Sequence, residues 1–222
     1  MMKKILIRSL VVIITLVLFL STYIYIFAKN AKKITVGTTI ENYEKDNYAL
    51  LVIDVQEATT GDYSTNEYYK ANSEELIIKI NKLIEKFDSK DATVIYVQNQ
   101  IDDKLINLFN NTYAKGSESV KLDKRLNIIS DHIISKSRQD AFSNPELDKI
   151  LIEHKVNKIF VVGLDAAYCV NSTIQAAQSR NYKITVIDKA VLSESEAKHD
   201  KLITQYKSRG VEVLSFTNTL PI

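Results

Sequence analysis

Three side chains that are capable of chemistry each lie near the end of a predicted strand. Cys169 is the only cysteine, which excludes an intramolecular disulfide and any site that needs several cysteine ligands. It follows the run KIFVVG by a short loop and opens a predicted helix. The partial positive charge and free N–H groups at a helix start favour a thiolate and can hold an oxyanion. This position is typical of a nucleophile, although a lone cysteine is more commonly a small buried apolar residue.

Asp54 and Lys136 are the other two candidates. Asp54 ends the apolar run LLVID, and Lys136 lies in IISKSRQDAF just after a short predicted strand. The alternatives are a helix cap or turn residue for Asp54 and a surface lysine for Lys136. None of the three histidines lies near a candidate residue in sequence, so Asp54 is a better candidate base than a histidine.

The elements that must position these residues alternate between strand and helix. Residues 48–55 form a continuous apolar run, as in a strand that is covered on both faces. Leu76–Phe87 carry an apolar helical stripe, for which Asn72 and Glu75 are a possible capping box. The alternation predicts an α/β fold with an open, doubly wound, mainly parallel sheet and helices on both faces. Ligands of such sheets bind beyond the carboxyl ends of the strands. The further predicted strands are 93–98, 132–135, 158–163, 183–188 and 211–215, and helices are expected near 145–151, 168–180 and 198–208.

The N-terminus predicts a membrane anchor. Residues 10–27 carry no charge, and 18 residues at about 1.5 Å each span about 27 Å, close to the thickness of a bilayer's hydrocarbon core. A cleaved signal peptide is the alternative, but its apolar region is normally shorter and a small-residue cleavage pattern follows it. We therefore predict an anchor over 1–28, a polar linker over 29–46 and a domain over 47–222. Basic residues flank both ends of the run, and a short N-terminal tail usually stays in the cytoplasm, which would place the domain outside.

Charge gives little support for nucleic-acid binding. The formal net charge is +2, but Lys3, Lys4 and Arg8 precede the apolar run, and 26 basic residues then face 27 acidic ones. The part beyond the anchor therefore has no basic excess to attract a polyanion. We expect a small molecule and the membrane as partners, with a homo-oligomer as a further possibility.

Three segments together resemble the signature blocks of isochorismatase-like cysteine hydrolases. They are LLVIDVQ, then KSRQDAFSNPEL, then GLDAAYCVNSTIQAA, and they occur in that order at suitable spacing. The resemblance covers about residues 48–216. It implies a Rossmann-like sheet and a triad in which Asp54 is the base, Lys136 its electrostatic partner and Cys169 the nucleophile. It also implies a cis peptide bond between Leu164 and Asp165, with the backbone N–H groups of Asp165 and Cys169 as the oxyanion hole.

Departures from the family pattern narrow the expected activity. The nicotinamidase branch has an Asp-x-His metal motif where this chain reads VQNQIDD, without histidine, so we expect no metal and no cofactor. True isochorismatases cleave a vinyl ether, which needs no thiol, so the retained Cys169 favours cleavage of a C–N bond through a thioester. The alternatives are a vinyl-ether hydrolase of the isochorismatase type and a binding module at the membrane without catalysis.

Overall fold

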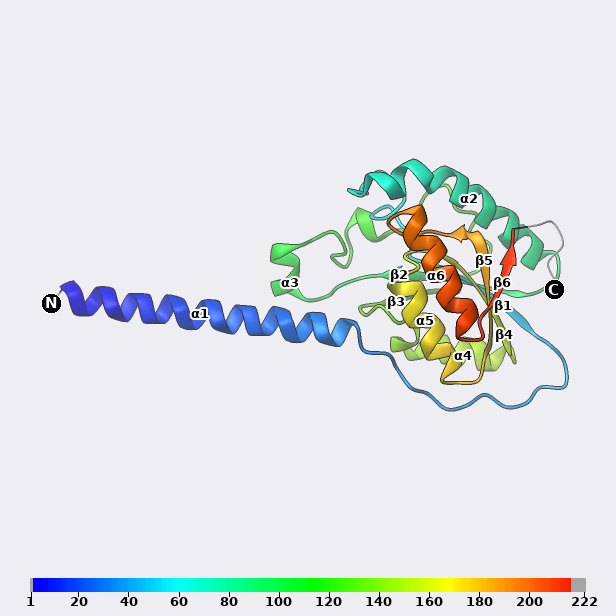
Figure 1. Cartoon of the computed structure of the whole chain (residues 1–222), viewed down its shortest axis with the longest axis horizontal. Helices are drawn as coiled ribbons and strands as arrows, with labels where there is room; N and C mark the ends of the chain where they lie inside the picture. The colour runs from blue at the N-terminus through cyan, green and yellow to red at the C-terminus, as the bar shows by residue number, and fades with distance from the viewer. Residues whose placement is uncertain (1, 217–222) are drawn as a thin grey trace.

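A computed structural model describes residues 2–216, and its centre is a six-stranded parallel sheet in the order β3-β2-β1-β4-β5-β6 (Figure 1). This confirms the predicted α/β class and the predicted parallel pairing. The last six residues of the domain predicted over 47–222 lie outside the described part. The strands are β1 (Tyr48–Ile53), β2 (Thr93–Asn99), β3 (Ile133–Lys136), β4 (Lys158–Gly163), β5 (Lys183–Val191) and β6 (Glu212–Ser215). The helices are α1 (Met2–Ala31), α2 (Glu67–Asp88), α3 (Lys104–Phe109), α4 (Pro145–Glu153), α5 (Cys169–Gln178) and α6 (Glu196–Ser208), with short 3-10 turns η1 (Glu118–Val120) and η2 (Ala141–Ser143).

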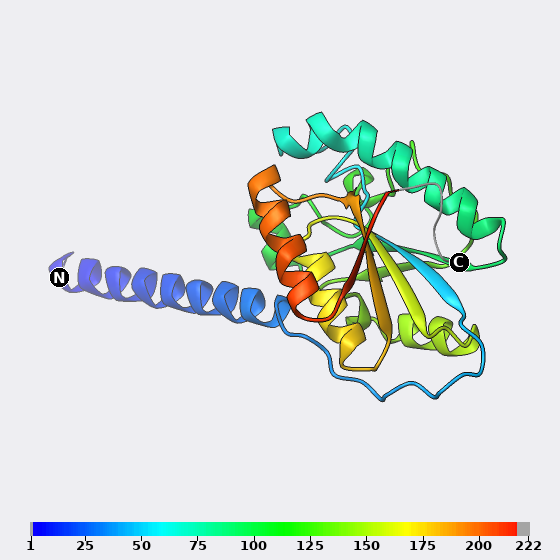
Figure 2. The same cartoon turned by 45° about the vertical axis from the view of Figure 1, so that its right-hand side comes forward.

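Helices cover both faces of the sheet, as predicted (Figure 2). Successive residues of a strand point to opposite faces, so β1 contributes to two cores. Its residues Leu51 and Ile53 join the core formed with α4, α5 and α6, whereas Leu50 and Val52 join the core formed with α2. Because β1 and β4 are buried on both sides, they appear in the sequence as uninterrupted apolar runs.

Two local predictions differ from the structure. The capping box at Asn72 and Glu75 is wrong, because α2 begins at Glu67 and Asn66 is its N-cap. The Asn66 side chain accepts the N–H groups of Tyr68 and Tyr69, so the expected capping chemistry occurs almost two turns earlier. In addition, α3 was not predicted, because its six residues are too few for an apolar period to stand out.

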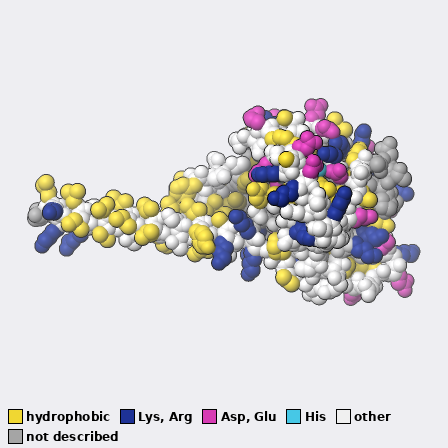
Figure 3. All heavy atoms as spheres, viewed as in Figure 1, with side chains coloured by type: hydrophobic (Ala, Val, Ile, Leu, Met, Phe, Trp, Pro, Cys, Tyr) yellow, Lys and Arg dark blue, Asp and Glu magenta, His cyan; other side chains and the backbone are white. Residues whose placement is uncertain are grey.

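Helix α1 extends from the domain and is long and apolar enough to span a membrane. It ends at Ala31, three residues beyond the predicted end of the anchor. Figure 3 shows hydrophobic side chains along its length and Lys or Arg side chains at both of its ends. None of its residues is fully buried, as expected for a helix whose apolar surface is not covered by the protein.

The segment predicted as a polar linker, residues 29–46, lies against the domain. Thr35 donates to the Asp140 carboxylate through its backbone N–H and through its hydroxyl. Ile40 donates its backbone N–H to the carbonyl of Arg180 at 2.9 Å. Ile34 and Ile40 also pack against the core beneath α4 and α5. The two isoleucines explain why a mostly polar segment is held on the surface instead of hanging free.

Candidate active site

The candidate residues meet where the strand order reverses, between β1 and β4. Crossovers leave this point in opposite directions, so the carboxyl ends of the two strands open a crevice there. Gly163 ends β4 with a φ of 107°, and a Cβ at this position would come within 2.1 Å of the Ile53 carbonyl oxygen. Only glycine therefore allows β4 to pass so close to the end of β1 and to turn into the loop before Cys169.

Asp54, Lys136 and Cys169 form one connected group. Lys136 Nζ lies 2.8 Å from Asp54 Oδ2 and 3.3 Å from Cys169 Sγ. Asp54 and Lys136 are buried, whereas Cys169 is partly exposed. The second carboxylate oxygen, Asp54 Oδ1, is buried and accepts no hydrogen bond from the described part of the chain. A buried charged oxygen without a donor is costly, so this atom is available to a proton that arrives during a reaction.

The backbone of Asp54 is fixed from both sides. Its φ of 52° lies in the left-handed region, and its N–H donates to the Val97 carbonyl at 2.9 Å. The Thr59 hydroxyl donates to the Asp54 carbonyl at 2.6 Å. Gln56 anchors the same turn to β2, because its side-chain oxygen accepts the Asn99 N–H at 2.7 Å. These contacts hold Asp54 in an uncommon backbone conformation, a feature often found at functional sites.

Electrostatics in this group favour the protonated form of Cys169. Burial and the neighbouring Asp54 carboxylate raise the pKa of the Cys169 thiol to about 12, and Lys136 offsets this only in part. Burial on its own would lower the pKa of Lys136, but Asp54 and Cys169 together raise it above its usual value. Burial and Asp54 therefore oppose the thiolate that the start of a helix is expected to favour.

The loop before Cys169 presents two unoccupied backbone donors. The peptide bond between Leu164 and Asp165 is cis. The N–H groups of Asp165 and Cys169 donate to no atom in residues 2–216, whereas the neighbouring N–H of Ala166 donates to Leu192. The Asp165 side chain accepts the Tyr69 hydroxyl at 2.7 Å, and burial raises its pKa. Backbone N–H groups without a partner, in the loop that leads to a thiol, are donors of the kind that can hold an oxyanion.

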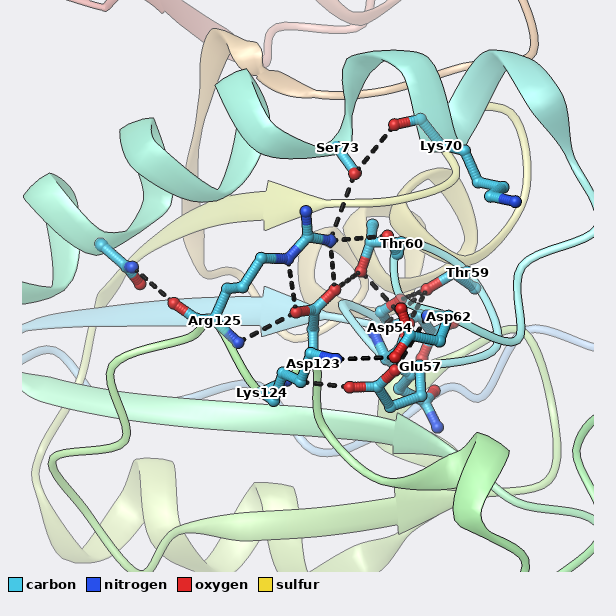
Figure 4. A network of polar contacts seen from close by, with 12 residues as sticks. Asp54, Glu57, Thr59, Thr60, Asp62, Lys70, Ser73, Asp123, Lys124 and Arg125 are labelled. Carbon is cyan, nitrogen blue, oxygen red and sulfur yellow. Dashed lines mark hydrogen bonds and ion pairs between the residues drawn. The ribbon is translucent and has the colours of Figure 1, made fainter.

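A second ion pair, between the buried Asp123 and the partly exposed Arg125, supports the turn that follows Asp54 (Figure 4). Asp123 is 1% exposed and accepts from the backbone N–H and the guanidinium of Arg125 and from the Thr60 hydroxyl. The same guanidinium donates to the Thr60 carbonyl and to the Ser73 hydroxyl on α2. The pair thus ties Thr60, in the turn after Asp54, to Ser73 on α2, without a direct hydrogen bond to Asp54, Lys136 or Cys169 among the contacts of residues 2–216.

The three histidines make no hydrogen bond, ion pair or ring contact with Asp54, Lys136 or Cys169 in the described part of the chain. The rings of His132 and His154 meet edge to face with 5.2 Å between their centroids, and His199 is buried beside Asp188 and Asp200. Within residues 2–216, no three His, Cys, Asp or Glu side chains cluster as a metal site would require. The region that reads VQNQIDD presents the amides Gln98 and Gln100, which hydrogen-bond to each other at 3.1 Å. We therefore derive no step that involves a metal.

Sequence reasoning missed Tyr113. Burial, with Asp54 and Cys169 nearby, raises the pKa of its phenol to about 12, so this ring belongs to the surroundings of the triad. Tyr113 lies in the segment between α3 and η1, and its carbonyl accepts the Ile101 N–H at 2.7 Å. No period or motif marks that segment, so only its position in space reveals the residue.

Comparisons with known proteins agree with this geometry. The isochorismatase domain model matches residues 48–218. An uncharacterized isochorismatase family protein, YddQ of Bacillus subtilis, is 26% identical over 157 residues, which cover 70% of this chain and 83% of that protein.

Solved structures share the fold. The N-carbamoylsarcosine amidase of Thermoplasma acidophilum has a TM-score of 0.67 at 24% identity. The match covers 79% of this chain and 99% of the amidase chain. The pyrazinamidase of Pyrococcus horikoshii, solved in complex with zinc, has a TM-score of 0.65 at 22% identity. The match covers 76% of this chain and 99% of the pyrazinamidase chain. The match of the family model over most of the chain confirms the resemblance carried by the three sequence blocks. The chain therefore belongs to the isochorismatase family.

Proposed function

We propose that this chain is a cysteine-dependent amidohydrolase that cleaves a C–N bond of a small amide or ureido compound. The observation that carries the proposal is the position of Lys136 Nζ, 2.8 Å from Asp54 Oδ2 and 3.3 Å from Cys169 Sγ. Asp54 is the base, Lys136 the electrostatic partner and Cys169 the nucleophile.

The first half of the reaction forms a thioester. Asp54 accepts the Cys169 proton as the sulfur attacks the carbonyl carbon, and the carbonyl π electrons move to oxygen. The backbone N–H groups of Asp165 and Cys169 hold this oxyanion. When the oxyanion collapses, the C–N bond breaks and the leaving nitrogen takes the proton from Asp54. Lys136 keeps its proton throughout and stabilises the negative charge, which passes from Asp54 to sulfur and oxygen.

The second half releases the acid. Asp54 removes a proton from water as the water oxygen attacks the thioester carbon. The C–S bond breaks, Asp54 returns the proton to sulfur, and a carboxylic acid leaves. The raised pKa of Cys169 supports a general-base route, since the resting thiol needs a base at the moment of attack.

Hydrolysis of a panel of small amides and ureido compounds by the full chain tests this mechanism. We expect turnover of at least one member, loss of turnover in Cys169→Ala, and an acyl adduct on Cys169 in acid-quenched samples analysed by mass spectrometry. Cys169→Ser is the matched variant, because it retains a polar group of similar size. Equal hydrolysis by wild type and Cys169→Ala would exclude the thioester route.

We further propose that α1 remains in the mature protein as a single-pass anchor, with the domain outside the cytoplasm. The support is the uncharged apolar run, which lies on a helix whose side chains are largely exposed. Protease treatment of intact cells should degrade the domain, and intact-mass analysis should retain residues 10–27. A mature N-terminus near Asn30 would instead identify a cleaved signal sequence, and protection of the domain until lysis would place it in the cytoplasm.

A further inference from the structure

We propose that α3 lies in the interfacial layer of the bilayer that α1 spans, so that the active-site edge of the sheet faces the membrane surface. This inference rests on the proposed anchoring of the chain and adds a second contact, made by the domain itself.

Helix α3 ends in two exposed apolar side chains. Leu108 is 77% exposed and Phe109 is 58% exposed. Among the large hydrophobic residues described between Tyr48 and Phe216, these two have the highest exposure. A single exposed leucine needs no explanation, but an adjacent leucine and phenylalanine at the tip of a projecting helix form a surface that water solvates poorly. Figure 1 shows α3 projecting from the domain toward α1.

A direct contact between the two helices sets the depth of α3. The Tyr23 hydroxyl of α1 donates to the carboxylate of Asp103, the N-cap of α3, across 80 positions of sequence. Tyr23 lies four residues before Phe27, where the apolar run ends, or about 6 Å along the helix axis. Helices that lie in the interface are buried by about 5–10 Å at the boundary between headgroups and acyl chains. If residues 10–27 span the hydrocarbon core, the contact with Tyr23 places the start of α3 about 6 Å inside the edge of that core, which is within this depth.

The surroundings of this contact suit an interface. Tyr23 and Tyr25 are aromatic residues of the kind enriched at headgroup depth. Lys29, Lys32 and Lys33 are exposed just beyond them, where they can pair with anionic headgroups. The apolar side chains at the tip of α3 match the acyl chains of the bilayer interface. The lysines at the end of α1 match its anionic headgroups.

The same side of the domain carries the active site. The Ala31 carbonyl, at the end of α1, accepts the N–H of Gln139, three residues after Lys136, at 2.9 Å. The segment from Ile101 to Tyr113 begins before α3 and ends at the ring beside Asp54 and Cys169. A bilayer that holds α3 would therefore also hold the loop that carries Tyr113 to the triad, and substrate would reach the site from the membrane surface.

The natural chain contains no tryptophan, so one introduced tryptophan reports its own surroundings. The full chain is reconstituted into two sets of vesicles of phosphatidylcholine and phosphatidylglycerol. The acyl chains carry bromine near the headgroup in one set and near their ends in the other, because Phe19 lies at the middle of the apolar run. Phe109→Trp tests α3, and Phe19→Trp reports on the anchor. Ile152→Trp is the matched control, since Ile152 is 57% exposed on α4 near the opposite edge of the sheet. We expect Phe109→Trp to lose most of its fluorescence to bromine near the headgroup and Phe19→Trp to bromine near the ends of the acyl chains, whereas Ile152→Trp keeps its fluorescence in both sets.

Each other outcome is decisive. If Phe109→Trp is quenched no more than Ile152→Trp while Phe19→Trp is quenched, the α3 contact is overturned and the anchor stands. A blue shift of Phe109→Trp that depends on protein density and not on bromine would assign the tip to a second copy of the chain and overturn the proposal. An unquenched Phe19→Trp would overturn the anchor and this inference together. Cys169-dependent turnover, measured on the same vesicles, reports separately on the proposed hydrolase.

Discussion

Two ion pairs each contain a buried carboxylate, Asp54 with Lys136 and Asp123 with Arg125, and the two carboxylates differ in how many of their oxygens accept hydrogen bonds. Asp123 accepts hydrogen bonds at both oxygens, from Arg125 and from Thr60 (Figure 4). Asp54 accepts from Lys136 at Oδ2, while its buried Oδ1 has no donor within residues 2–216. The pair around Asp123 therefore has no free lone pair to offer a reactant, and the pair around Asp54 does.

This difference separates a structural role from a chemical one. A fully hydrogen-bonded buried pair rigidifies its surroundings, and any proton added to it breaks an existing bond. A partly satisfied pair is less stable in the resting state and can accept a proton at little further cost. The comparison predicts that replacing the aspartate by asparagine affects mainly turnover at Asp54 and mainly stability at Asp123.

The largest contrast is expected in turnover. We predict that Asp54→Asn lowers kcat/KM for a hydrolysed amide by about 10³-fold, because the amide cannot accept the thiol proton. Asp123→Asn is the matched variant, with an expected change of less than about tenfold, since Asp123 contacts none of the reacting groups. Steady-state kinetics of both variants on one substrate measures the ratio. Comparable losses in the two variants would remove the distinction between the pairs.

The next largest effect is expected in stability, at Lys136. Lys136→Met leaves the Asp54 carboxylate buried without a counter-charge, and we expect this to lower the free energy of unfolding by about 3–5 kcal/mol. For a domain of this size, that corresponds to a fall in Tm of roughly 10 °C. Thermal unfolding of the full chain in detergent measures the change.

The double variant sharpens this test. Asp54→Asn combined with Lys136→Met removes both charges, so we expect it to recover most of the lost Tm while remaining inactive. A double variant as unstable as Lys136→Met would show that packing, and not the unpaired charge, causes the loss.

The sequence predicts the frame of the site better than its electrostatics. The apolar runs at β1 and β4 identify the two central strands, because a strand that is buried on both faces has apolar residues without polar alternation. Asp54 and Cys169 follow from their places at the ends of those strands. The direction of the Cys169 pKa shift does not follow, because it depends on burial and on the distance to a carboxylate more than 100 positions away. Tyr113 and α3 were missed because their segment is short and aperiodic.

A smaller effect on stability is expected in the saturated pair. We predict that Asp123→Asn costs about 2 kcal/mol, since two charge-assisted hydrogen bonds are weakened, and that Tm falls by about 5 °C at neutral pH. Arg125 holds the pKa of Asp123 below its usual value against the opposing effect of burial. A carboxyl whose pKa is lowered on folding stabilises the protein above its unfolded pKa, about 4, and this contribution is lost as the pH falls through its folded pKa.

The pH dependence is the check on that reasoning. The Tm difference between wild type and Asp123→Asn should narrow as the pH falls below about 4, because wild type then loses the same charge. A difference that stays constant from neutral pH to pH 3 would indicate that Asp123 contributes through shape alone.

The smallest effect is expected in the titration of Cys169, and it tests why the unsaturated pair suits catalysis. With Asp54 ionised, the thiol pKa is raised to about 12, so the alkylation rate of Cys169 should still rise with pH beyond 8.5, the value of an ordinary thiol. Asp54→Asn removes the neighbouring negative charge and leaves Lys136 facing the sulfur. We therefore predict that its alkylation midpoint lies about 1–2 pH units below that of wild type. The rate of modification by iodoacetamide, followed by intact mass, measures both profiles, and Asp123→Asn should retain the wild-type profile.

A wild-type midpoint at or below 8.5 would mean that Cys169 rests as a thiolate paired with Lys136. In that case Asp54 would act by orienting Lys136 and not as the base that removes the thiol proton.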